Sequence, residues 1–158
     1  MKKIIKYVLI IALIALVVMQ FIRPEKNNAG YDSVAAFEAE TKPSVVVAGI
    51  LKDNCYDCHS NQTKYPWYAE IAPFSYWLED HIKHGKGDFN VSEWEDYSLK
   101  KKDHKLEEVI EMVEKGEMPL DSYTWIHGNL SEEDKTLLLQ WVALARMQYK
   151  AQLEITSK

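Results

Sequence analysis

Residues 54–61 read NCYDCHSN and contain both cysteines of the 158-residue chain. Within this stretch, residues 55–59 have the C-x-x-C-H form that marks covalent haem attachment. Two thiols on one helical turn can reach the two vinyl groups of a porphyrin, and the imidazole that follows can bind iron through Nε2. We expect the Nδ1–H of His59 to donate to a carbonyl oxygen, which would fix the ring. The motif predicts one haem c attached through Cys55 and Cys58, with His59 as an iron ligand.

Three other uses of the two cysteines stay open at this point. A zinc site could combine Cys55, Cys58 and His59, although structural zinc usually takes two separate ligand pairs and the chain has no second C-x-x-C. A thioredoxin-like dithiol would need a βαβ setting, which the hydrophobic pattern does not predict. A disulfide between cysteines this close would shut a very short loop and stabilise little.

The second axial ligand of a haem iron must come from elsewhere in the chain. We expect Met118, which follows Gly116 at a predicted helix end and precedes the stiffening Pro119. A thioether sulfur is a soft ligand, and Met/His ligation raises the reduction potential of haem. Met112, by contrast, is expected to fill the core. An open sixth position or a histidine is the alternative, and the candidate histidines are His81, His84 and His127.

The spacing of apolar residues predicts an all-α fold, with short helices and long connections around the haem. No pair of alternating runs joined by a hairpin turn occurs. The expected helices cover residues 31–42, 74–84, 101–115 and 131–145, and Gly85 and Gly116 are expected to end the second and third. Residues 44–54 fit a strand and a helix equally well. We expect aromatic residues of the connections, Tyr65, Trp67 and Tyr123, to wall the haem pocket or to bond its propionates. Without the cysteines, an ordinary core would be the favoured explanation of these residues.

The N-terminus is expected to be a transmembrane helix. Residues 4–22 read IIKYVLIIALIALVVMQFI, which as a helix would span roughly 28 Å, close to the thickness of a bilayer core. A cleaved signal peptide and a buried helix are the alternatives. The expected organisation is an anchor over residues 1–22, a tether and possible short helix over 23–43, and a haem domain over 44–150. This arrangement predicts a single-pass protein of the bacterial cytoplasmic membrane with the haem domain on its outer, periplasmic side.

The charge of the chain limits its partners. The formal net charge is −5 with histidine neutral, which argues against a nucleic-acid partner because such a partner requires a basic surface. We expect instead an unidentified redox partner protein. No nucleophile with a paired base and no glycine-rich phosphate loop occurs, so electron transfer is expected rather than enzymatic catalysis.

The chain resembles a bacterial haem-binding domain family of membrane-anchored, c-type-cytochrome-like proteins. The resemblance is carried by CYDCHSNQTKYPWY (55–68), IAPFSYWLEDHIKHGK (71–86), FNVSEW (89–94) and MPLDSYTWIH (118–127), and with residues 131–145 it covers most of 44–145. It implies a small cytochrome c-like helical domain. Lys86 stands where members of the family often have arginine. A contact of Lys86 with a haem propionate would therefore involve a single ammonium charge rather than the two parallel hydrogen bonds that a guanidinium group can donate.

These observations favour a membrane-anchored carrier of single electrons with a His/Met-ligated haem. A haem-based gas or redox sensor and a peroxidase-like enzyme are the alternatives that require an open sixth site. A structural haem subunit of a membrane complex is the third alternative.

Overall fold

The computed structural model describes residues 1–156, and the regular secondary structure of these residues is helical. The described part has no β-strand, and its one isolated bridge joins Asn28 to Gln62. The all-helical expectation is therefore confirmed. The α-helices are α1 (Lys2–Met19), α2 (Ala35–Thr41), α3 (Val45–Asn54), α4 (Tyr56–His59), α5 (Phe74–Asp88), α6 (Leu99–Glu114), α7 (Asp121–His127) and α8 (Glu132–Thr156). Short 3-10 helices are η1 (Tyr31–Val34), η2 (Trp67–Glu70) and η3 (Val91–Asp96).

The N-terminal expectation needs correction. Among residues 1–156, no helix combines the length and the apolar character needed to cross a bilayer. The helix α1 stops at Met19 and includes Lys2, Lys3 and Lys6, so its uncharged part, residues 7–19, covers only about 20 Å. The predicted transmembrane helix over residues 1–22, and the single-pass membrane location that followed from it, are wrong.

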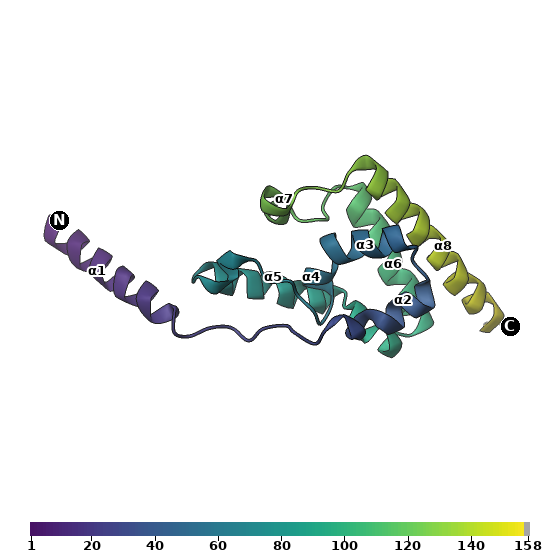
Figure 1. The fold of residues 1–158 in the computed structure, drawn as a ribbon, viewed down its shortest axis with the longest axis horizontal. Coiled ribbons are helices and arrows are strands. Elements are labelled where there is room, and N and C mark those ends of the chain that lie inside the picture. The colour runs from purple at the N-terminus through teal and green to yellow at the C-terminus, as the bar shows by residue number, and fades with distance from the viewer. Residues whose placement is uncertain (157–158) are drawn as a thin grey trace.

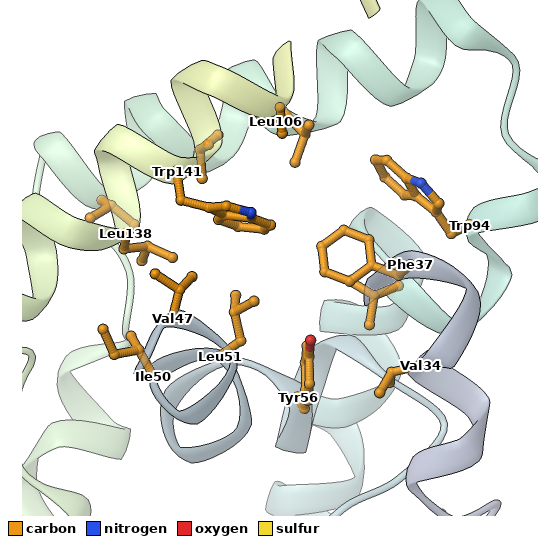
Figure 2. Packing of buried hydrophobic residues seen from close by; sticks show 14 of the residues in the cluster. Val34, Phe37, Val47, Ile50, Leu51, Tyr56, Trp94, Leu106, Leu138 and Trp141 are labelled. Atoms are coloured by element: carbon orange, nitrogen blue, oxygen red, sulfur yellow. The ribbon is translucent and has the colours of Figure 1, made fainter. Parts of the chain in front are cut away.

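The core is formed by α2, α3, η3, α6 and α8, with α6 packed along α8 (Figure 1). The ring of Phe37 lies between Trp94 and Trp141, at centroid distances of 5.0 and 5.9 Å, in edge-to-face geometry (Figure 2). Trp94 is fully buried, and its indole N–H donates to the Tyr149 hydroxyl at 3.2 Å. Aromatic rings in such contacts bury much apolar surface and prefer this angle.

Side-chain caps settle where several helices begin. Ser44 accepts from the Val47 N–H at 3.2 Å, so the stretch with ambiguous periodicity is the helix α3 rather than a strand. Ser131 accepts from the Asp134 N–H at 3.0 Å, just before α8 begins at Glu132.

Three local expectations differ from the structure. The helix α5 runs through Gly85 to Asp88, so that glycine does not end it. Residues 121–127 were expected in a connection and form α7. Residues 23–30, expected as a mere tether, contact the folded part. Arg23 and Lys26 both pair with Glu70.

Candidate functional site

A cavity of about 670 Å³ lies where α4, α5 and α6 meet the chain that leads into α7. Pockets for cofactors and drug-sized ligands are usually roughly 300–1,000 Å³. The lining is largely apolar, as a large planar cofactor requires, and it includes Leu51, Val109, Val113, Leu130 and Leu138. Cys55, Cys58 and His59 all reach this cavity, so the fold places the whole C-x-x-C-H motif on one wall.

Cys55 stands at the junction of α3 and α4, and Cys58 lies within α4. The Cys55 N–H donates to the Leu51 carbonyl at 2.9 Å, and the Cys55 carbonyl accepts the His59 N–H at 2.9 Å, so both helices meet at this residue. The cysteines are free rather than joined as a disulfide. Burial raises the pKa of the Cys55 thiol to about 12 and that of Cys58 to about 11. A redox-active dithiol needs a lowered thiol pKa, so this environment does not suit one.

The ring of His59 is held by two backbone carbonyls. Its Nδ1 lies 3.0 Å from the Gly85 oxygen and 2.9 Å from the Phe89 oxygen. Carbonyl oxygens only accept hydrogen bonds, so Nδ1 carries a proton, and in the neutral ring the lone pair is therefore on Nε2. This is the arrangement found in metal-ligating histidines, in which the second nitrogen donates to a fixed acceptor. The expectation that Nδ1–H meets a carbonyl agrees with this geometry.

Gly85 is required by a close approach between α5 and α4. A Cβ atom at this position would lie 2.7 Å from the Cys58 carbonyl oxygen and 3.1 Å from the Cys58 Cβ. Such distances are too short for any side chain, so only glycine lets α5 bring its carbonyl to His59. Sequence reasoning missed this role. A glycine inside a helical pattern is a signal of close packing, and it was interpreted as a stop instead.

Met118 lines the cavity and is half-buried against the core. Its N–H donates to the Met112 carbonyl at 3.2 Å, which ties it to the end of α6. The structure thus brings Met118 to the same cavity as His59. Met112, expected as a core filler, lines the cavity as well, so two thioethers are available there.

The other candidate histidines separate into two groups. His81 and His84 line the cavity, and the Nδ1 atom of each lies 2.8 Å from the carbonyl oxygen four residues earlier. His127 does not line it. Its Nε2 lies 2.9 Å from the Tyr68 hydroxyl of η2.

The predicted aromatic residues of the pocket wall are not all brought together. Tyr123 lines the cavity, and its hydroxyl donates to the Asp53 carbonyl at 2.7 Å. The Tyr65 hydroxyl accepts the Asn27 N–H at 2.7 Å, and Trp67 is 77% exposed. Neither residue lines the cavity. The expectation that Tyr65 and Trp67 wall the pocket is therefore not met by this geometry.

Lys86, considered above as a cation for a propionate, has another partner. Its Nζ donates to the Asn27 Oδ1 at 2.8 Å. This bond holds the segment that follows α1 against α5.

One comparison with known proteins points to haem. A family model described as a haem-binding domain matches residues 14–144. Comparison with curated proteins and with solved structures gives no match. The cavity volume, its apolar lining and the free Nε2 of His59 fit a haem group. The match spans most of the sequence, and the chain therefore belongs to the haem-binding domain family.

Proposed function

We propose that this protein carries single electrons through one haem c, held by Cys55 and Cys58 and ligated by His59 and Met118. When bound, haem supplies a one-electron couple at its iron. Each thioether arises by addition of a cysteine S–H across a vinyl double bond, so no atom leaves and no oxidant is consumed. The observation that carries the proposal is the pair of carbonyl oxygens at 3.0 and 2.9 Å from His59 Nδ1.

Each chain residue has a distinct task in this proposal. His59 presents an unprotonated Nε2 in a fixed orientation, because its other nitrogen donates to Gly85 and Phe89. Met118 offers a soft sulfur from the segment that follows α6, which favours the reduced state of iron. The apolar walls exclude water and so lower the local dielectric constant. If His59 and Met118 both bound the iron, no coordination position would remain for a substrate, and such a site would suit outer-sphere electron transfer.

A test of the ligation compares three methionines. The full chain would be matured with haem-attachment machinery, and the far-red absorption band of sulfur–iron ligation would be recorded for the wild type, Met118→Leu, Met112→Leu and Met147→Leu. Met147 is 65% exposed and serves as the control. We expect the band to vanish in Met118→Leu alone. Its loss in Met112→Leu instead would transfer the role to that residue, and its absence from the wild type would contradict Met/His ligation.

The electron-carrier role is tested by the rate at which carbon monoxide binds the haem iron. Slow binding of carbon monoxide to the ferrous wild type at neutral pH is expected, since both axial positions are filled. Fast binding would indicate an open site and a sensor or peroxidase-like protein.

We expect the redox partner to present a basic surface. Four acidic residues line the cavity against a single lysine, Lys105, and the acids are Asp80, Asp88, Glu108 and Glu111. Such charges steer a partner of opposite sign and lose their effect with salt. Electron exchange with basic small proteins should therefore slow as ionic strength rises.

A further inference from the structure

The segment that carries Met118 is bounded by two glycines in the left-handed region. Gly116 has a φ of +72° and Gly128 a φ of +82°, values that other residues rarely adopt. Between them, Met118, Leu120 and Tyr123 line the cavity. We call residues 117–127 the Met118 segment.

The Met118 segment has little packing of its own. No residue of α7 is buried, and Trp125 is 81% exposed. Figure 1 shows α7 standing apart from the other helices, at the end of two connecting stretches of chain. A helix of seven residues is marginal in water by itself. Its position over the cavity must depend on a small number of specific contacts.

Two side-chain hydrogen bonds supply such contacts, one made by Tyr123 and one by His127. The Tyr123 hydroxyl donates to the Asp53 carbonyl at 2.7 Å, two positions before Cys55 in the chain. The Tyr68 hydroxyl of η2 and the His127 Nε2 lie 2.9 Å apart. The rings of Tyr123 and His127 stack, with centroids 4.3 Å apart and an angle of 14° between their planes. The two hydrogen-bonded side chains are therefore in direct contact with each other.

We propose that Tyr123 and His127 are positioning residues that hold the Met118 segment against the cavity, and that its release between Gly116 and Gly128 admits small ligands. This inference rests on the proposed function, because it assigns how Met118 is kept at the iron. Neither residue needs to touch the iron in this role. The hydroxyl of Tyr123 is committed to the backbone of α3 rather than to a propionate.

Two variants remove the hydrogen bonds and keep the stacked rings. Tyr123→Phe lacks only the hydroxyl, and His127→Phe replaces the imidazole with a larger aromatic ring that has no nitrogen. The matched controls are Tyr65→Phe, which loses a hydroxyl bonded to the Asn27 N–H at 2.7 Å, and His104→Phe on α6. Neither control residue lines the cavity.

The haem-loaded full chain would be measured in two ways. The first is the rate at which carbon monoxide binds the ferrous protein, and the second is amide hydrogen exchange over residues 120–128. Loss of one hydrogen bond should raise about fivefold the fraction of molecules in which the Met118 segment is released from the cavity. We therefore expect about a fivefold rise of both rates in each variant, a larger rise in the double variant and no change in the controls.

The possible results separate the two proposals. A wild type without the far-red sulfur band would overturn ligation by Met118, and the positioning role with it. A wild type with the band, together with unchanged rates in both Tyr123→Phe and His127→Phe, would overturn the positioning role alone. An equal rise in Tyr65→Phe would also overturn it, since the effect would then be general.

Discussion

The aromatic core and the cavity are filled in different ways, although they share a wall. Around Trp94 the space is closed by side chains alone. Phe37 meets Trp94 and Trp141 edge to face, and Tyr149 accepts a hydrogen bond from the Trp94 indole N–H. Around His59 the chain instead leaves about 670 Å³ bounded by apolar residues. Leu51 belongs to both regions. The contrast indicates that the aromatic core is stable through its own packing, and that the cavity around His59 is shaped for haem.

The largest expected effect belongs to the thiols. The double variant Cys55→Ser/Cys58→Ser should lose covalent haem completely, because a hydroxyl does not replace a thiol in thioether formation. Denaturing electrophoresis with haem staining and intact mass would measure this loss. Helicity by circular dichroism should stay close to that of the wild type, since neither thiol takes part in the aromatic pairs. Haem that resists denaturation in this variant would contradict attachment at these residues.

The next effect tests the core. Trp94→Ala removes a fully buried indole and should cost roughly 3–5 kcal/mol of unfolding free energy. Trp125→Ala is the matched control, because that indole is 81% exposed and its loss should change stability by less than about 0.5 kcal/mol. Urea unfolding followed by circular dichroism gives both values. Equal effects of the two variants would mean that the core around Trp94 does not dominate stability.

The same contrast explains what the sequence could predict. The C-x-x-C-H turn was accessible because it depends on residues within one helical turn. The Ser44 cap is equally local, yet the apolar pattern of residues 44–54 fitted a strand and a helix equally well. The helix over 101–115 was predicted from its apolar face and appears as α6.

Features that depend on distant contacts were missed. Gly85 looks like a helix stop until α4 is known to lie against it. The helix α7 has no apolar face turned to the core, so periodicity gave no signal for it. The bond from Tyr65 to the Asn27 N–H joins segments far apart in the chain, and no local pattern reports it.

A third prediction concerns the wall that α4 and α5 share. Gly85→Ala places a Cβ 2.7 Å from the Cys58 carbonyl oxygen and should force the two helices apart, at a cost of roughly 1–3 kcal/mol. The carbonyl of this residue would move away from His59 Nδ1, so the reduction potential should shift as well. Spectroelectrochemistry and urea unfolding measure the two effects.

Gly87 gives this variant a control on the same helix. A Cβ there would meet no atom within 4 Å, and the residue lies in α5. Gly87→Ala should therefore stabilise the protein by up to about 1 kcal/mol and leave the potential unchanged. A potential that shifts equally in both variants would show that His59 does not depend on the approach of Gly85.

The smallest effect tests whether α3 serves the core or the cavity. Ser44→Ala removes the cap at the start of α3 and should cost about 1 kcal/mol, whereas Ser44→Asp keeps an acceptor for the Val47 N–H and should restore stability. Val47 and Ile50 pack in the core, while Cys55 follows the last turn of the same helix. If core contacts are what mainly hold α3 in place, Ser44→Ala should lower the free energy of unfolding by the same amount in protein with and without haem. Urea unfolding of both forms decides the point, and a cost confined to the haem-loaded form would assign α3 to the cavity instead.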